Sequence, residues 1–389
     1  MKRIAVIGFY HTEMSLCLSK YMAMQGTEVD YYCVCDLLRD KGYQSGYEYF
    51  KASKRLGITT VTEKGAPEII ADTRGLSINH YLLRILSFSN KLWFVNKLIL
   101  KKAFKKIRAK RYDAIDIIGQ NHMLKFFHEE LKTENITHTF HEIGSHQDGI
   151  VSTPLIQTVI NDKTKVILPS TSTYSRFVCL PGVDKNRVSI CPVGEHLSLL
   201  LYERDVDIEL NIDISKPTFL FYGYIKPYKG LPFLAEAMRF LQGQFDRFNL
   251  IVAGAGTDDA LPYFQALENC QVINRFLSND EIVKLNRICD VVLLPYKTAS
   301  QSGIVLTSFM YGKPIIGTKV GALVETIKDG HNGLLVDNDN PKEFADAMMK
   351  IIDNRDFASN LVKGALEFGH GDDYDWNIIA QQTIKFLME

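Results

Sequence analysis

The chain has 389 residues, of which 46% are hydrophobic and 23% charged, with 45 Lys and Arg against 45 Asp and Glu. This length exceeds what one hydrophobic core usually serves, so we expect two domains. The composition excludes a disordered or fibrous protein, and the balanced charge gives no argument for nucleic acid as a partner.

The cysteines and the amino terminus bear on the compartment. The seven cysteines are odd in number and scattered along the chain, which suits reduced thiols in a cytosolic protein. The opening "MKRIAVIGFYHTE" has too short an apolar run for a signal peptide, and no apolar run approaches the ~18 residues of a membrane span. We therefore expect a cytoplasmic protein.

Short β-branched or apolar runs alternate with helical patterns along the whole chain. This alternation predicts parallel sheets with helices on both faces, hence an α/β fold with two doubly wound, Rossmann-like domains. Strands are expected at 3–8, 29–34, 112–119, 137–144 and 165–169, and again at 218–223, 249–254, 271–274, 290–296, 313–318 and 332–336.

The domain boundaries follow from a stretch without a clear period. Residues 197–216 gather acidic side chains and form the expected interdomain connection, which gives a first domain at 1–196 and a second at 217–372. In the remaining segment, 373–389, one helical face carries Trp376, Ile379, Ala380, Thr383 and Leu387. Such a helix needs a surface to cover.

Residues 91–111 are strongly basic, with nine Lys or Arg and no acidic residue. Leu92, Val95, Ile99, Ala103 and Ile107 recur there at helical spacing. A basic amphipathic helix can lie on an anionic membrane surface, where each cation contributes ~1 kcal/mol. The same pattern also fits a solvated helix over a domain core, and both interpretations stay open.

Several common motifs are missing. There is no GxxxxGK[ST], and the GxG at Gly254 and Gly256 has Asp259 where a dinucleotide fingerprint needs Gly or Ala. Because no HExxH or Cys/His cluster occurs, we expect neither a metal site nor a bound cofactor.

The stretch "SQSGIVLTSFMYGKP", residues 300–314, predicts a helix over 304–311 directly after an expected strand. Such a helix presents free N–H groups and the positive end of its dipole to the edge where these folds bind ligands. Gly303 permits close approach, Ser300 and Ser302 can donate hydrogen bonds, and no acidic side chain repels an anion. An anion site is expected here; the alternative is an ordinary helix cap.

A second anion contact is indicated by "YGYIKPYKG", residues 222–230. Gly223 ends a predicted strand, and Lys226 and Lys229 precede the next predicted helix. Two ammonium groups at the carboxyl end of a strand can neutralise a diphosphate.

Five segments together resemble a known family. "FLFYGYIKPYKGLPFLAEAM", "LIVAGAG", "FLSNDEIVKLNRICDVVLLPY", "SQSGIVLTSFMYGKPIIGTKVGALVETI" and "DGHNGLLV" are similar in order and spacing to the carboxyl-terminal domain of GT-B glycosyltransferases. The similarity is to the large retaining group, glycosyl transferases group 1, that includes bacterial cell-surface polysaccharide and lipid-linked glycan transferases. It implies two Rossmann-like domains facing across a cleft, an acceptor-binding domain at 1–196, a nucleotide-sugar-binding domain at 217–372, and a last helix, 373–389, that crosses back to the first domain.

The resemblance also implies roles for single residues. Lys229 matches the family's phosphate-binding lysine, and because the family's arginine falls on Tyr224, Lys226 is expected to replace it. The turn whose amides hold the diphosphate matches Ser302, Gly303 and Ile304, and the segment lining the base matches residues 274–277. The donor contacts so implied are Gly223, Tyr224, Asn274, Phe276, Leu277, Ser302, Gly303 and Ile304.

The sequence departs from the family in its acidic residues. Many members carry two Glu around the helix at 304–311; the second falls on Thr307 here, and the first falls in "TASQ". Gln301 and Thr307 are therefore expected to take neutral hydrogen-bonding roles in a divergent subgroup, with Glu325 as the nearest remaining carboxylate.

In the first half, "TFHEIGSHQDG" at 139–149 resembles the segment where the family places a histidine near the donor sugar. His141 is the first choice for this catalytic role, and His146 is the second. The family's glycine pair after the first strand is replaced by "GFYHTE" at 8–13, so His11 and His146 become candidates on the acceptor side. His141 and His146 could instead each simply form hydrogen bonds within their own loop.

The resemblance implies a metal-independent, retaining glycosyltransferase. It would move a hexosyl group from a nucleoside diphosphate sugar to a hydroxyl of a glycan or lipid-linked acceptor, in cell-surface polysaccharide synthesis at the inner face of the membrane. Two alternatives remain. One is a GT-B sugar epimerase using Glu142 and Asp148; the other is a catalytically silent GT-B-like binding subunit.

Overall fold

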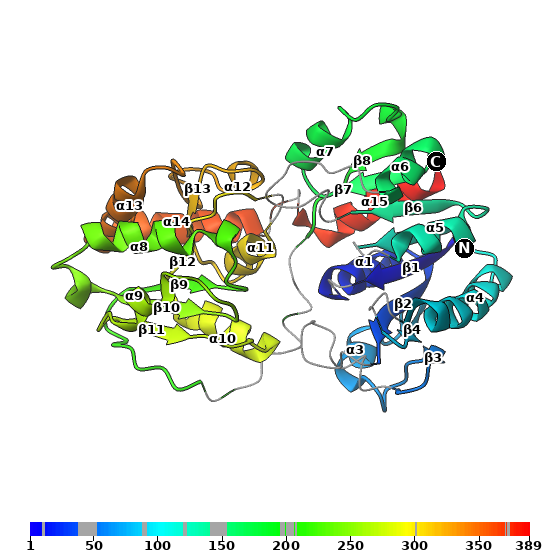
Figure 1. Ribbon diagram of the computed structural model, residues 1–389, viewed down its shortest axis with the longest axis horizontal. Coiled ribbons are helices and arrows are strands. Elements are labelled where there is room, and N and C mark those ends of the chain that lie inside the picture. Colours follow the sequence, from blue (N-terminus) through cyan, green and yellow to red (C-terminus); the bar gives the residue numbers. More distant parts are fainter. Residues whose placement is uncertain are drawn as a thin grey trace. The chain divides into compact units, whose positions relative to one another are not determined.

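The structure is a computed structural model of the chain. It describes residues 1–9, 12–37, 53–87, 92–119, 123–140, 154–194, 199, 206, 208–299, 302–369, 371 and 374–389. They form two compact units (Figure 1): unit 1 is Met1–Leu201 with Asp373–Glu389, and unit 2 is Tyr202–Asp372. The chain first passes between the units at a point inside the connection expected at 197–216.

Unit 1 is built on one sheet with the strand order β3-β4-β2-β1-β5-β6-β7-β8 in its described part. Neighbouring strands are parallel except β3 and β4. The central strand β1 is buried from its second residue onward, because its side chains face helices on both sides. The strands are β1 (Arg3–Phe9), β2 (Glu28–Asp36), β3 (Gly57–Thr60), β4 (Ile78–Ile85), β5 (Ala114–Ile118), β6 (Ile136–Thr139), β7 (Lys165–Leu168) and β8 (Val188–Ile190).

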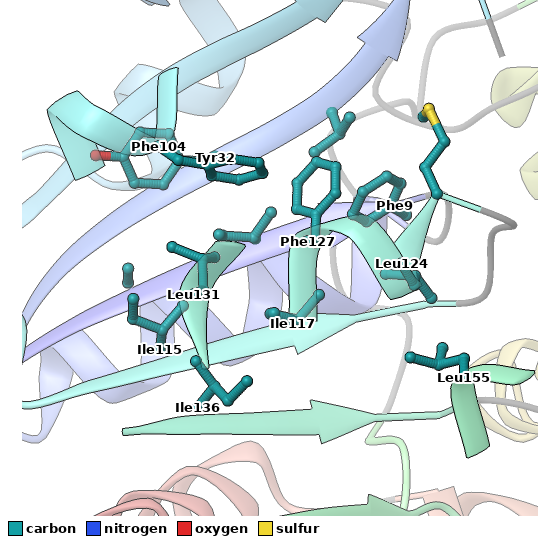
Figure 2. Packing of buried hydrophobic residues seen from close by; sticks show 14 of the residues in the cluster. Phe9, Tyr32, Phe104, Ile115, Ile117, Leu124, Phe127, Leu131, Ile136 and Leu155 are labelled. Carbon is teal, nitrogen blue, oxygen red and sulfur yellow. The ribbon is translucent and has the colours of Figure 1, made fainter. Parts of the chain in front are cut away.

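Helices cover both faces of this sheet. One face packs against α4 (Trp93–Ala109), α5 (Leu124–Leu131), α6 (Pro154–Asn161) and α7 (Thr171–Phe177). Figure 2 shows the centre of that core, where the Phe127 ring lies 4.6 Å from the Phe9 ring and 4.7 Å from the Phe104 ring, edge to face in both cases. The other face packs against α1 (Thr12–Met24), α3 (Pro67–Asp72) and α15 (Trp376–Met388), and η2 (Lys185–Arg187) precedes β8.

The buried face of α4 differs from the one expected from the sequence. Leu100, Ala103, Phe104 and Ile107 are buried, as is Asn96, whereas Val95 is exposed. The amide of Asn96 fixes this rotation, because its Oδ1 accepts a hydrogen bond from Leu86 N at 3.0 Å and its Nδ2 donates to Ser87 O. Of the apolar positions noted in the sequence, 103 and 107 are buried, 92 and 99 are half-buried, and 95 is exposed.

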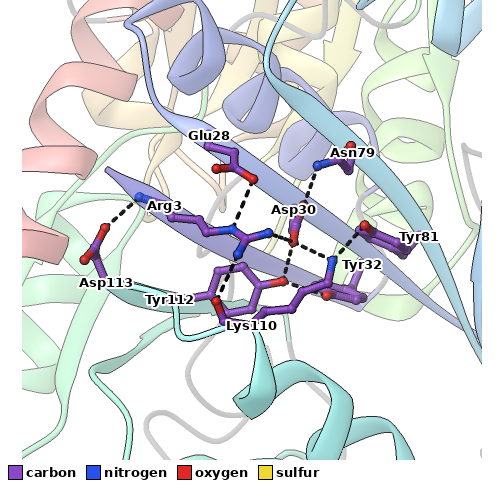
Figure 3. Close-up of polar contacts among 9 residues, drawn as sticks. All are labelled: Arg3, Glu28, Asp30, Tyr32, Asn79, Tyr81, Lys110, Tyr112 and Asp113. Atoms are coloured by element: carbon purple, nitrogen blue, oxygen red, sulfur yellow. Dashed lines mark hydrogen bonds and ion pairs between the residues drawn. The ribbon is translucent and has the colours of Figure 1, made fainter. Parts of the chain in front are cut away.

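A polar network closes the amino-terminal ends of the unit 1 strands (Figure 3). The fully buried carboxylate of Asp30 accepts hydrogen bonds from Lys110 Nζ at 2.7 Å, from Asn79 Nδ2 at 2.8 Å and from the Tyr112 hydroxyl. Arg3 NH2 lies 3.5 Å from the same carboxylate. A buried charge needs such partners, so the network holds β1, β2, β4 and the start of β5 together at the edge opposite the carboxyl ends.

The carboxyl-terminal helix α15 belongs to unit 1, where it packs against α1 and β5. The residues expected on its apolar face, Trp376, Ile379, Ala380, Thr383 and Leu387, are all buried. The Trp376 ring fills the space where a Cβ on Gly194 would lie, 2.6 Å from its nearest ring atom. A side chain at position 194 would push the helix away.

Unit 2 has a fully parallel sheet with the order β11-β10-β9-β12-β13-β14. Its strands are β9 (Thr218–Tyr222), β10 (Asn249–Ala253), β11 (Cys270–Ile273), β12 (Val291–Leu294), β13 (Ile315–Thr318) and β14 (Gly333–Val336). Its helices are α8 (Leu231–Phe240), α9 (Leu261–Gln265), α10 (Asn279–Ile288), α11 (Gly303–Met310), α12 (Leu323–Thr326), α13 (Pro341–Asp353) and α14 (Arg355–Gly369), with 3₁₀ turns η4 (Pro227–Lys229) and η5 (Phe245–Arg247).

Both sheets run outward in two directions from a central pair of strands. The chain order reverses between β1 and β5 in unit 1 and between β9 and β12 in unit 2, as in a doubly wound Rossmann fold. The α/β class with two such domains is confirmed. The expected strands are present in the described residues, and β3, β4 and β8 are additional strands that the sequence did not predict.

Candidate functional site

The candidate site lies at the switch point of the unit 2 sheet, outside the carboxyl ends of β9 and β12. Ligands of doubly wound folds bind at this position, because the connections after the two strands depart in opposite directions and leave a crevice. Of the predicted donor-binding residues, Gly223 and Lys229 follow β9, and Ser302, Gly303 and Ile304 follow β12.

Backbone contacts hold the segment that follows β9 against the segment that follows β12. Gly230 has φ +72, and a Cβ there would lie 1.7 Å from Pro295 O. Beside it, Lys297 N donates a hydrogen bond to Tyr228 O at 2.8 Å. Only glycine fits at position 230, because both the positive φ and the close carbonyl exclude a side chain. The turn η4, which carries Lys229, is therefore fixed against the segment that leads into α11.

Lys229 is the central cation of the site. Its side chain is only 8% exposed, and its Nζ donates a hydrogen bond to the Tyr296 hydroxyl. The same Nζ lies 4.2 Å from the centre of the Tyr296 ring and 5.6 Å from that of Tyr228. A buried ammonium held by phenols attracts an anion strongly, because little water screens its charge.

Tyr296 is a site residue that sequence reasoning missed. Burial raises the pKa of its phenol, and the neighbouring Ser302 hydroxyl offsets part of that rise, so the phenol stays neutral. Tyr296 thus lies between Lys229 and the start of α11. Its only signal in the sequence was its place at the end of "DVVLLPY".

The helix α11 begins at Gly303, one residue before the predicted start, with Ser302 as its extended N-cap residue. The first N–H groups of a helix have no partner within the helix, and the first turn of α11 carries no acidic residue. A Cβ on Gly223 would lie 3.1 Å from Ile304 Cδ1 and 3.7 Å from Lys229 Nζ. Gly223, Lys229 and the first turn of α11 therefore meet at one point.

A second group of predicted residues lies at the ends of β9 and β11. The rings of Tyr224 and Phe276 are each 39% exposed, with centres 6.4 Å apart, and Lys226 Nζ lies 5.9 Å from the Tyr224 ring centre. Asn274 is exposed and Leu277 is buried. Two accessible aromatic faces next to a cation suit a planar, anionic ligand.

Of the other predicted site residues, two lie among the residues that the structure describes and four lie outside them. Thr307 is buried within α11, and Glu325 is partly exposed on α12. A Cβ on Gly321, just before α12, would lie 1.6 Å from Ala299 O, so that helix is held against the segment before α11. The predicted residues His11, His141, His146 and Gln301 lie outside the described residues.

Comparisons with known proteins agree with this geometry. Residues 204–368, most of unit 2, match the family model of glycosyl transferases group 1. A D-inositol 3-phosphate glycosyltransferase of Corynebacterium glutamicum is 27% identical over 214 residues, which cover 51% of this chain and 51% of that protein. The chain spans about half the length of the curated relatives it matches.

Two solved structures resemble the whole chain. Sucrose-phosphate synthase from Thermosynechococcus elongatus has a TM-score of 0.69 at 16% identity and covers 99% of this chain and 98% of its own. Anabaena HepE in complex with UDP-glucose has a TM-score of 0.65 at 15% identity, covering 100% and 99%. At these identities the likeness shows the fold, which is GT-B. The chain thus has the GT-B fold, and its residues 204–368 match the family of glycosyl transferases group 1.

Proposed function

We propose that this chain is a glycosyltransferase that takes a sugar from a nucleoside diphosphate donor bound at unit 2. The observation that carries the proposal is the meeting of Gly223, the buried Lys229 and the first turn of α11 at the switch point of the sheet. A diphosphate placed there would face an ammonium group and helix N–H groups. The glycine would leave room for its oxygens.

In the proposed reaction, the bond between the anomeric carbon and the diphosphate oxygen breaks while an acceptor hydroxyl forms a new bond to that carbon. The diphosphate gains negative charge as it leaves, and Lys229 with the amides of α11 would stabilise that charge in the transition state. The departing oxygen would take the proton of the acceptor hydroxyl. No separate carboxylate base is then needed, which suits the missing paired Glu.

The finer features of this activity rest on the family resemblance. We propose retention at the anomeric carbon, transfer of a hexosyl group without a metal ion, and His141 near the donor sugar. The proposed acceptor is a glycan or lipid-linked hydroxyl used in cell-surface polysaccharide synthesis. The reaction would then take place in the cytoplasm, at the inner face of the cell membrane.

The first test is binding of the donor nucleotide. A panel of UDP, GDP, ADP and dTDP with their sugars is added to the full chain, and the midpoint of thermal unfolding is measured. One nucleotide should raise the midpoint, because a ligand that binds the folded state stabilises it. UDP is tested first, since the HepE structure holds UDP-glucose. If no nucleotide shifts the midpoint, the binding-subunit alternative is favoured.

The second test is catalysis. Lys229→Ala should lower turnover of the matched donor at least ~100-fold, by analogy with the loss of one oxyanion donor. Lys363→Ala removes an exposed lysine from α14 as the matched control and should leave turnover unchanged. Near-normal transfer by Lys229→Ala would refute its role. Incubating the protein with donor but no acceptor distinguishes the transferase from the epimerase, because only an epimerase yields an epimerised nucleotide sugar.

A further inference from the structure

The helix α4 exposes large apolar side chains beside a row of lysines. Phe94 is 74% exposed and Leu98 is 52% exposed, and Val95 is exposed next to them. Phe94 and Leu98 are four residues apart, so they lie one above the other on the helix. The buried residues of α4, from Asn96 to Ile107, lie on the opposite side and pack onto the unit 1 sheet.

The next turns of the same face carry cations. Lys101, Lys102, Lys105 and Lys106 are all exposed, and helical spacing places them in line with Phe94 and Leu98. Among the described residues, none of these four forms an ion pair. By contrast, Arg108 NH1 lies 3.8 Å from Glu130 Oε2 on α5, and Lys97 Nζ lies 5.4 Å from the Trp93 ring centre. We call the seven residues Phe94, Val95, Leu98, Lys101, Lys102, Lys105 and Lys106 the α4 surface.

The part of α4 that carries the exposed apolar residues is held in place by packing against unit 1. The Trp93 ring packs edge to face on Phe126, with ring centres 5.1 Å apart, and Phe104 is fully buried beneath the helix. The exposed Phe94 ring therefore projects from a fixed helix. An exposed phenyl ring keeps apolar area in water, and burying it in another phase would be favourable.

We propose that the α4 surface binds an anionic membrane surface, with Phe94 and Leu98 entering the lipid interface and the four lysines contacting headgroups. Charge complementarity selects the partner, because an exposed row of lysines without ion pairs in the described residues attracts anionic lipid. The apolar residues favour a membrane over a soluble polyanion, since a hydrated polymer offers no phase to receive a phenyl ring.

The contact is peripheral. In the part of the chain that the structure describes, no helix has the length and apolar character needed to cross a bilayer. The α4 surface consists of unit 1 residues and the candidate donor site of unit 2 residues, so this proposal is tested independently of the proposed transfer reaction.

The test is sedimentation of the full chain with vesicles of phosphatidylcholine alone, and with vesicles in which about a third of the lipid is phosphatidylglycerol. Binding should appear on the anionic vesicles and weaken as salt rises. Since each lysine near the surface contributes ~1 kcal/mol, Lys→Gln at 101, 102, 105 and 106 together should lower the partition coefficient at least ~100-fold. Phe94→Ser with Leu98→Ser should lower it at least ~10-fold.

Matched controls separate the α4 surface from general charge. Lys→Gln at 54, 64, 163 and 185 removes the same charge from exposed sites elsewhere on unit 1, and Phe240→Ser removes an exposed ring from unit 2. Neither control should change binding. Tryptophan fluorescence monitors folding of the α4 variants, because both tryptophans, Trp93 and Trp376, lie in unit 1.

Three results would overturn the proposal. The first is equal retention on neutral and anionic vesicles, and the second is an equal loss of binding in the lysine control. The third is undiminished binding by the folded Phe94→Ser, Leu98→Ser variant together with full competition by dextran sulfate. That last result would make the α4 surface a site for a soluble polyanion.

Discussion

The Nζ atom of Lys165, on β7, lies 2.8 Å from the carbonyl oxygen of Leu387, at the end of α15. The same ammonium lies 3.1 Å from Phe386 O, and Asn135 Nδ2 donates to Leu387 O at 2.9 Å. The last carbonyls of a helix have no partner within it and carry the negative end of its dipole. Lys165 supplies both a donor and a positive charge, although burial lowers the pKa of its ammonium.

Lys165→Met should therefore destabilise unit 1 by about 1–2 kcal/mol, because it removes the cap and leaves the carbonyls without this donor. Lys185→Met, at an exposed position of the same unit, controls for the lost charge and should change stability little. Denaturant unfolding followed by tryptophan fluorescence measures both. Equal stability of the two variants would show that the contact contributes nothing to α15 docking.

The carboxyl of Asp116 on β5 predicts a pH dependence. It is fully buried, Thr139 donates to its Oδ1 at 2.8 Å, and its Oδ2 has no hydrogen-bond partner among the residues that the structure describes. Burial raises its pKa to about 7. The folded chain holds the Asp116 proton more tightly than the unfolded chain does. The contribution of the protonated carboxyl to the free energy of unfolding is therefore fully present below about pH 4 and is lost as pH rises toward 7.

Asp116→Asn should remove this dependence of the free energy of unfolding on pH. It should also stabilise unit 1 above pH 7, by up to about 4 kcal/mol if the whole shift of the Asp116 pKa contributes. Glu129→Gln on α5 is the control, because it removes an exposed acid from the same unit. Tryptophan-detected unfolding at pH 5 and pH 8 gives the comparison. A wild-type slope retained in Asp116→Asn would assign the pH dependence to another group.

Gly230 allows a test of how the site is built. Gly230→Ala should destabilise unit 2 by at least ~3 kcal/mol and abolish nucleotide binding, because the new Cβ meets Pro295 O and displaces η4. Gly243→Ala has a similar positive φ but nothing within 4 Å of its Cβ, so it should cost only about 1 kcal/mol. Hydrogen exchange of unit 2 amides measures both. Similar protection in the two variants would mean that the packing at Pro295 does not matter.

The bond between Lys229 and Tyr296 predicts a positioning role. Tyr296→Phe should weaken binding of the matched nucleoside diphosphate about 10-fold, since losing one hydrogen bond to a charged group costs about 1.5 kcal/mol. The loss should appear in KM more than in kcat if the phenol only holds the ammonium in place. Tyr263→Phe, at a half-buried phenol of α9, is the control. If Tyr296→Phe binds the nucleotide with wild-type affinity while Lys229→Ala binds it more weakly, Lys229 does not depend on Tyr296 for its position.

The spacing of apolar residues predicted the elements whose buried positions recur at the regular period of a helix or a strand. The apolar face of α15 was predicted correctly because every inward position follows the 3.6-residue period. The rotation of α4 was not, since Asn96 is buried by hydrogen bonds to Leu86 and Ser87 just after β4, which no helical period reveals. The strand β4 was missed because "INHYLLRI" mixes polar and apolar residues without clean alternation.

The candidate site divides in the same way. Local chemistry in the sequence pointed to Lys229 and to the first turn of α11, which carry their signal in neighbouring residues. The partner of Lys229 could not be read, because Tyr296 lies 67 residues away and joins it only through the order of the strands. The histidines proposed for the donor sugar and acceptor stay predictions.

The placement of α15 also sets an order for folding during synthesis. Unit 2 is one continuous stretch of chain, whereas unit 1 lacks a helix that covers one face of its sheet until residues 374–389, which follow unit 2, have been synthesised. The apolar surface under Trp376 and Ile379 stays open to solvent for that whole interval. The half synthesised first is thus finished last, and a nascent chain stalled before α15 would be a ready target for chaperones.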